Sequence, residues 1–231
     1  MKILSIDSSA KTASVCVTDG KTLLSECFVN AGLTHSKTLM PMVDNALNQA
    51  DLKIKDIDAF CVNVGPGSFT GIRIGVAAVK GLALASDKPC AGVSTLEAIA
   101  YNFIDENVVV CAAMDARCNQ VYAALFEIKN GVINRICDDY AVPISELEEE
   151  IKKIGKTVIL AGDGAEICFN AMKESLGNIR LSSEFRRYQR AYGAALASIN
   201  HNDFIDSSLL APIYLRMPQA ERELKLKKEN K

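Results

Sequence analysis

A glycine-rich loop between a short apolar run and a long apolar helix is the segment best suited to bind a ligand. The apolar run covers residues 59–64, the loop covers 65–67, and Ser68 can cap a helix that begins near Gly71. Backbone N–H groups at such a helix start attract phosphate or carboxylate, so this order predicts an anion cradle. An isoleucine and an arginine follow Gly71, where a P-loop would carry lysine. P-loop nucleotide chemistry is therefore not expected.

Two residues just past the first predicted strand, Asp7 and Ser8, could assist this loop. Actin-like ATPases and RNase H-like nucleases both place a magnesium-binding carboxylate at this position. A strand-end turn, in which Asp and Ser bond their own backbone, explains the same residues. On the first interpretation we expect a weak or vestigial cofactor site formed by Asp7, Ser8, Gly65 and Gly67.

Two kinds of catalyst can be compared with this pattern. An actin-like ATPase needs a second glycine-rich phosphate loop, but the corresponding loop at residues 115–120 has no glycine. Tight triphosphate binding is therefore not expected. A two-metal nuclease needs several carboxylates around its metals, and only Asp7, Glu97 and Asp115 are available. The sequence does not show whether these three converge.

Metal-ligand and covalent-nucleophile motifs are missing from the sequence. The two histidines, His35 and His201, are far apart, and the eight cysteines form no C-x-x-C pair. We interpret the cysteines as reduced thiols of the core. The sequence thus predicts no catalytic residue, no metal ligand and no resident cofactor.

The order of predicted elements indicates an α/β fold with two lobes. Three strands, with an Asp19-Gly20 hairpin, are followed by alternating helices and strands, and a similar order recurs, weakly, from residue 107. This order is typical of the RNase H-like or actin-like half. We expect one lobe at 1–104, a second at 105–218 and a flexible charged tail at 219–231. The pattern leaves open which lobe the last helix joins.

Two helices, predicted at 36–50 and 71–85, carry more apolar surface than one sheet can cover. The second has two apolar faces, so it needs either a neighbouring helix of the same chain or another subunit. We expect the second case, with a partner interface that serves both a homodimer and a second protein. Its predicted residues are Leu39, Met40, Val43, Leu47, Ile72, Gly75, Val76, Val79 and Leu82.

Composition sets the remaining expectations. The chain has 231 residues, 49% of them apolar, and a net charge of −2, so no global field attracts it to nucleic acid or membrane. Its longest apolar runs fall short of the ~20 residues of a membrane span, and its first residues form a strand pattern. We expect a cytoplasmic protein.

Four segments together resemble the TsaB family, also called YeaZ. They are GPGSFTGIRIG at 65–75, the opening KILSIDSSAKTASVCV, THSKTLMPMV around His35, and APIYLR at 211–216. The resemblance implies a two-lobed actin/Hsp70-like (ASKHA, RNase H-like) fold with mixed sheets. It also implies a role in bacterial synthesis of N6-threonylcarbamoyladenosine (t6A) at tRNA position 37. In that family TsaB is a noncatalytic scaffold and dimerization subunit.

The same resemblance implies partners and departures from the catalytic paralogue, TsaD. TsaD-like proteins carry two metal-binding histidines in a pattern like V-N-H-L-E-G-H, and Thr95 and Ile99 stand at those positions here. The implied partners are TsaD, the ATPase TsaE and a second copy of this chain, with tRNA reached only through the complex. ATP, magnesium and metal would be supplied through the partner subunits. An independent ATP-binding kinase or ATPase, and an RNase H-like nuclease, are the alternatives.

Overall fold

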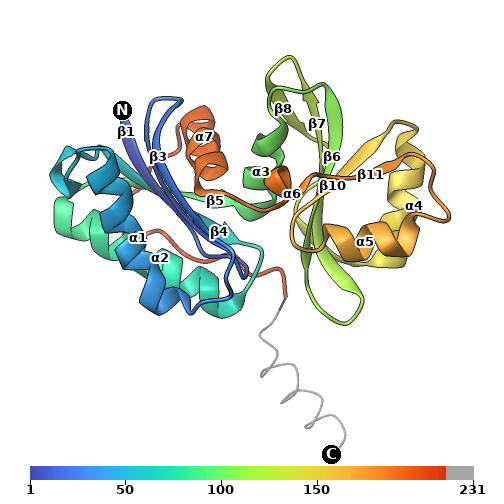
Figure 1. Ribbon diagram of the computed structural model, residues 1–231, viewed down its shortest axis with the longest axis horizontal. Coiled ribbons are helices and arrows are strands. Elements are labelled where there is room, and N and C mark those ends of the chain that lie inside the picture. Colours follow the sequence, from blue (N-terminus) through green and yellow to red (C-terminus); the bar gives the residue numbers. More distant parts are fainter. Residues whose placement is uncertain (217–231) are drawn as a thin grey trace, which may run out of the picture.

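The computed structural model describes residues 1–216, which form two α/β lobes side by side (Figure 1). Each lobe is built on one mixed sheet with helices packed against its faces. This confirms the predicted fold class. The predicted tail at 219–231 lies outside the described residues.

The first lobe contains a five-stranded sheet in the order β3-β2-β1-β4-β5. Strands β1, β2 and β4 are buried on both faces, whereas β3 at the edge is largely exposed or half-buried. The predicted hairpin joins β2 to β3, with its two-residue turn at Gly20-Lys21, one residue later than predicted, because Asp19 pairs with Thr22. Helices α1 and α2 cover one face, and α7 covers the other (Figure 1). The elements are β1 (Lys2–Asp7), β2 (Ala13–Asp19), β3 (Thr22–Val29), α1 (His35–Gln49), η1 (Ile54–Asp56), β4 (Ala59–Gly65), α2 (Phe69–Ser86), β5 (Cys90–Ser94), α3 (Thr95–Ala100) and η2 (Tyr101–Phe103).

The second lobe contains a six-stranded sheet in the order β11-β10-β6-β7-β8, with β9 paired to β7. Read from the other edge, the strands have the connectivity of the first lobe: an antiparallel meander followed by two parallel strands. The weak repeat in the sequence is therefore a repeat of topology. The elements are β6 (Val108–Asp115), β7 (Gln120–Lys129), β8 (Val132–Arg135), β9 (Tyr140–Pro143), α4 (Ile144–Ile154), β10 (Val158–Ala161), α5 (Ala165–Met172), β11 (Ile179–Leu181) and α6 (Glu184–Arg187).

The last helix, α7 (Ala191–His201), returns to the first lobe, which answers the question that the sequence left open. Its small residues pack on the back of that lobe's sheet, and Gly193 lies so close to Ala98 that a Cβ would be 2.2 Å from the Ala98 carbonyl oxygen. The segment leading into α7 ties both lobes together. Gln189 donates to the Thr12 hydroxyl at 2.8 Å, and Arg190 pairs with Glu26 at 2.9 Å.

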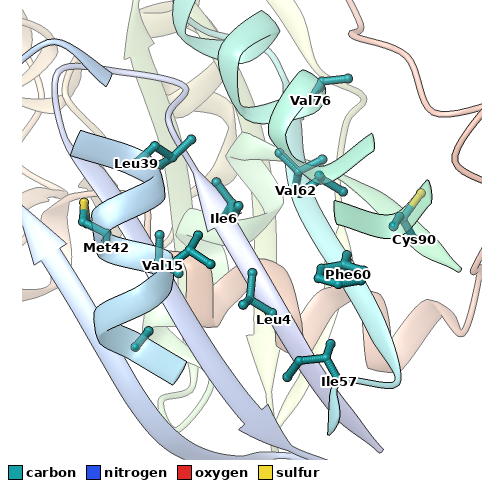
Figure 2. Close-up of a cluster of buried hydrophobic side chains, with 14 of the residues drawn as sticks. Leu4, Ile6, Val15, Leu39, Met42, Ile57, Phe60, Val62, Val76 and Cys90 are labelled. Atoms are coloured by element: carbon teal, nitrogen blue, oxygen red, sulfur yellow. The ribbon is translucent and has the colours of Figure 1, made fainter. Parts of the chain in front are cut away.

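The apolar faces of α1 and α2 that were predicted to meet a partner instead pack on the chain's own sheet. Leu39, Met42 and Val76 belong to the same buried apolar cluster as the strand residues Ile6 and Val62, and Figure 2 labels all five. Burial of the predicted interface residues is nearly complete for Leu39, Val43, Leu47, Ile72, Gly75, Val76 and Val79.

For these seven residues the interface prediction is wrong. A 3.6-residue period identifies an apolar face but not the surface that covers it. The remaining two, Met40 and Leu82, are exposed and half-buried respectively.

The side of α2 away from the sheet is apolar and only partly covered, because Ile74, Ala78 and Leu82 on it pack against the margin of the first-lobe core. We call this side the outer stripe. Of the described helices, α2 alone is long and apolar enough to span a membrane by composition, with mean hydropathy 1.3, yet only 33% of it is buried. One face of α2 packs on the sheet of the first lobe. The outer stripe consists of Ile74, Ala77, Ala78, Gly81, Leu82, Leu84 and Ala85, all half-buried or exposed.

Candidate functional site

A cleft of about 540 Å³ separates the two lobes, and the predicted glycine loop lies on one of its walls. The first lobe contributes the β1–β2 turn and the start of α2, and the second contributes the β6–β7 turn and Asp163. The segment 213–216 closes one side, because Ile213 N–H donates to the Val64 carbonyl oxygen at 2.8 Å and Arg216 Nη1 donates to the Ala116 carbonyl oxygen at 3.0 Å. Of the four residues predicted to form a cofactor site, Gly67 lines this cleft, whereas Asp7, Ser8 and Gly65 are not among its lining residues.

Close packing inside the first lobe explains the glycines of the loop. A Cβ on Gly65 would be 2.4 Å from the Ile213 carbonyl oxygen, and one on Gly67 would be 2.3 Å from the Ser9 carbonyl oxygen. Both glycines also have positive φ angles, which L-residues rarely adopt. The Ser68 N–H donates to the Ser9 carbonyl oxygen at 2.6 Å, so one of the expected anion donors is already used. Packing therefore accounts for the glycines of the loop, and they no longer indicate an anion-binding site.

Gly71 and Gly75, within α2, are also positions where a side chain would collide with a neighbouring residue. A Cβ on Gly71 would lie 2.1 Å from the Ser8 carbonyl oxygen, and a Cβ on Gly75 would lie 2.5 Å from the Ser8 hydroxyl. The Ser8 hydroxyl in turn donates to the Gly71 carbonyl oxygen at 2.8 Å. The glycine pattern lets α2 sit directly on the β1–β2 turn.

Asp7 and Ser8 lie beneath this contact and not on the cleft surface, since both are almost fully buried. One oxygen of Asp7 accepts hydrogen bonds from the Ser9 hydroxyl at 2.6 Å and from Asn63 Nδ2 at 2.7 Å. Its other oxygen, Oδ2, has no donor among the described residues. Burial raises the pKa of Asp7, and the two hydrogen bonds oppose that shift only in part. The turn interpretation of Asp7 and Ser8 is the one that this geometry favours.

The second-lobe wall is formed by a tight loop at the end of β6. Arg117, Cys118 and Asn119 all have positive φ angles, and Asp115 Oδ1 accepts from the Arg117 N–H at 2.7 Å. This left-handed run replaces the glycines that a phosphate loop would use. Asp163 completes the wall, and its Oδ1 accepts from the Asp115 N–H at 3.1 Å.

Both signs of charge are present in the cleft. Burial raises the pKa of Asp163 to about 6, and the nearby charges of Asp115 and Asp7 add to the effect. The lining contains two carboxylates, Asp115 and Asp163, and three cations, Lys11, Arg117 and Arg216, so the carboxylates would repel a phosphate only locally. Lys11, Asp163 and residues 213–216 also line the cleft, and the sequence did not predict this. These residues lie close together only because the two lobes pack against each other.

The three carboxylates considered for a nuclease do not converge. Glu97 pairs with Arg135 at 3.3 Å and with His201 at 2.8 Å. Within residues 1–216 no group of three His, Cys, Asp or Glu side chains is arranged to hold a metal ion. Glu97 thus belongs to an ion-pair network between α3, α7 and the second lobe.

The raised pKa of Asp163 predicts a pH-dependent effect of Asp163→Asn. Below about pH 3 the carboxyl is protonated in both the folded and unfolded states, so the variant gains nothing. As the pH rises from about 3 to 6, the unfolded state loses this proton first, and the folded wild type becomes progressively less stable. We expect the variant to be about 2 kcal/mol more stable at pH 7.5, with a gain of less than about 1 kcal/mol at pH 4.2. Urea unfolding of both proteins at pH 4.2 and 7.5 checks this; equal differences at the two pH values would contradict it.

Comparisons with known proteins place the chain in a family. The family model described as "TsaD: tRNA N6-adenosine threonylcarbamoyltransferase" matches residues 30–204. The chain is 30% identical over 221 residues to the tRNA threonylcarbamoyladenosine biosynthesis protein TsaB of Bacillus subtilis, with 96% of each chain covered. It is 32% identical over 178 residues to the TsaB protein of Escherichia coli, covering 76% of this chain and 77% of that protein.

A solved structure shows the same fold. It is described as an uncharacterized protein with similarity to peptidase YEAZ from Pseudomonas aeruginosa, and it superimposes with a TM-score of 0.78 at 24% identity. The match covers 93% of this chain and 99% of that one. The two-lobed arrangement is therefore a shared architecture.

Proposed function

The chain belongs to the TsaB (YeaZ) family and takes part in t6A biosynthesis, and on this premise we propose that it is a noncatalytic scaffold and dimerization subunit that binds and supports TsaD. The exposed part of the outer stripe, formed by Ala77, Gly81, Leu84 and Ala85, is the observation that carries the proposal. An apolar helix surface that the chain itself leaves exposed is typical of a protein that needs a partner.

The noncatalytic part of the proposal rests on α3. Thr95 and Ile99, at the positions where TsaD-like proteins carry metal-binding histidines, are both fully buried. Ile99 belongs to the apolar cluster that joins α3 to β6 and β7 between the lobes. An apolar side chain in a packed cluster cannot ligate a metal, and a threonine hydroxyl is a poor substitute for imidazole.

The outer stripe suits more than one partner. Its small residues, Ala77, Ala78 and Gly81, permit close approach of a second helix, while Leu84 offers a large side chain that is 77% exposed. Met40 on α1 adds an adaptable apolar group. We propose that a second copy of this chain and TsaD use this same surface, which predicts competition between the homodimer and the heterodimer.

The remaining parts of the proposal concern ligands and location. TsaE is the associated ATPase, tRNA is reached only through the complex, and the complex works in the cytoplasm. ATP, magnesium and metal are supplied by the partner subunits. The buried Asp7 and the loop without glycine at 115–120 favour weak nucleotide binding by this chain alone over an independent kinase or ATPase.

The proposed function is tested by reconstituting the reaction from purified proteins and leaving out one component at a time. Threonylcarbamoyl transfer to tRNA is measured with the purified chain alone, with TsaD and TsaE alone, and with all three proteins. We expect no transfer by the chain alone and at least a tenfold lower rate when it is omitted. Transfer by the chain alone, or a full rate without it, would refute the proposal.

A further inference from the structure

A second concavity, of about 650 Å³, lies in the second lobe, away from the interlobe cleft. It opens at the edge of the sheet where the parallel strands β6, β10 and β11 begin, whereas the cleft lies where β6 and β10 end. We call it the basic groove. Its lining comprises Asn107, Val108, Val109, Glu127, Ile128, Lys129, Asn130, Lys156, Thr157, Ile159 and Arg180.

Three cations and a single carboxylate line the basic groove, although the whole chain has a net charge of −2. Glu127 accepts from Lys156 Nζ at 2.6 Å, and the charges of Lys156 and Lys129 lower the pKa of Glu127. The single carboxylate of Glu127 cannot neutralise all three cations, so the groove carries an excess of positive charge.

Arg180 differs from the arginines that hold the lobes together. Arg135, Arg186 and Arg190 each form an ion pair with a carboxylate. Within residues 1–216 the structure gives Arg180 no acidic side chain at ion-pair distance, and the residue is exposed. A guanidinium that lines a concavity and has no carboxylate at ion-pair distance is suited to bind an external oxyanion through two parallel hydrogen bonds.

The walls of the groove are fixed by hydrogen bonds before any ligand arrives. Asn107 Oδ1 accepts from the Asn130 N–H at 2.8 Å, which ties the start of β6 to the β7–β8 turn. Asn178 Nδ2 donates to the Lys156 carbonyl oxygen at 2.9 Å, and the Val158 N–H donates to the Asn178 carbonyl oxygen at 2.9 Å. Cations carried on walls held in this way need less ordering when a ligand binds.

The floor of the groove is apolar, formed by Val108, Ile128 and Ile159. A volume of this size suits a compact organic molecule, and an apolar floor favours a ligand with an apolar portion over a bare ion. The excess positive charge matches a phosphate monoester, which carries a charge close to −2 at neutral pH. We propose that the basic groove is a binding site for a small organic phosphate.

Phenyl phosphate is a suitable probe because its ring can cover the floor while its phosphate meets Arg180 and Lys129. Titrations of isotope-labelled protein are followed by amide chemical shifts, with inorganic phosphate and phenol in parallel. We expect shifts centred on residues 107–109, 127–130, 156–159 and 180, with a Kd of about 1 mM. Inorganic phosphate is expected to bind about tenfold more weakly, and phenol not to shift these residues. Salt at 0.5 M should weaken the phosphate-dependent binding.

Arg180→Gln and Lys129→Gln test the site, with Lys173→Gln as the matched control. Lys173 is exposed at the end of α5, outside the groove, and its substitution removes the same charge. We expect at least fivefold weaker phenyl phosphate binding by each groove variant and no change in the control.

Equal binding by all four proteins would overturn the proposal. So would shifts spread over exposed lysines and arginines in general, or shifts confined to the interlobe cleft.

Discussion

Glutamate in place of Leu84 is expected to abolish both self-association and TsaD binding while leaving the monomer folded. Leu84 is 77% exposed in the chain, so the substitution should change the free energy of unfolding by less than about 0.5 kcal/mol. At an apolar interface the same carboxylate would be buried without a partner, which costs several kcal/mol. We expect association to weaken at least a hundredfold, or roughly 3 kcal/mol. Sedimentation velocity and a TsaD pull-down measure it.

Asn48→Glu is the matched control for this experiment, because it adds the same charge to an exposed position of α1 outside the outer stripe. It should associate as the wild type does. A Leu84→Glu protein that stays dimeric and bound to TsaD would show that the outer stripe is not the interface. By contrast, a charge at Val76 or Leu47 is expected to unfold the lobe, because both side chains lie in its core.

Alanine in place of Gly71 is expected to destabilise the first lobe by about 3 kcal/mol or more. The new Cβ would lie 2.1 Å from the Ser8 carbonyl oxygen, a backbone atom that cannot rotate away. Relief requires α2 to move off the β1–β2 turn, which also disturbs the contact between Ser68 and Ser9. Urea unfolding, followed by circular dichroism, gives the change in free energy.

Gly81→Ala is the matched control in the same helix. A Cβ at Gly81 meets no atom within 4 Å, so only helix propensity changes, and we expect a gain of about 0.5–1 kcal/mol. If both alanine variants were stabilised alike, the account of the glycine pattern as close packing would be wrong. A loss confined to Gly71→Ala would support it.

Local pattern was enough to predict most of the fold. The alternating apolar residues of 2–7 and 13–18, and the Asp19-Gly20 turn, specify strands and a hairpin within a few residues. The two similar runs of elements indicated two lobes, and both sheets have the same connectivity. The position of α7 was not predictable, because it depends on contacts such as that of Gly193 with Ala98, nearly a hundred residues away in sequence.

The candidate sites were harder to predict because their residues meet only after folding. The sequence identified both apolar faces of α2, but not that Val76 faces the sheet while Leu84, absent from the predicted interface, faces outward. The glycines of 65–75 were correctly singled out, yet the reason was backbone contact and not ligand contact. Arg180 had no sequence signal, because its lack of a carboxylate partner is a property of three-dimensional packing.

Support of TsaD by the outer stripe, without chemistry in the chain itself, can be measured as stimulation of TsaD activity. Threonylcarbamoyl transfer to tRNA is followed in the reconstituted system while wild-type, Leu84→Glu or Asn48→Glu chain is titrated in. We expect saturable stimulation by the wild type and Asn48→Glu, and at least a hundredfold higher concentration of Leu84→Glu for half-maximal stimulation. Stimulation by Leu84→Glu at wild-type concentrations would show that TsaD is not supported through the outer stripe.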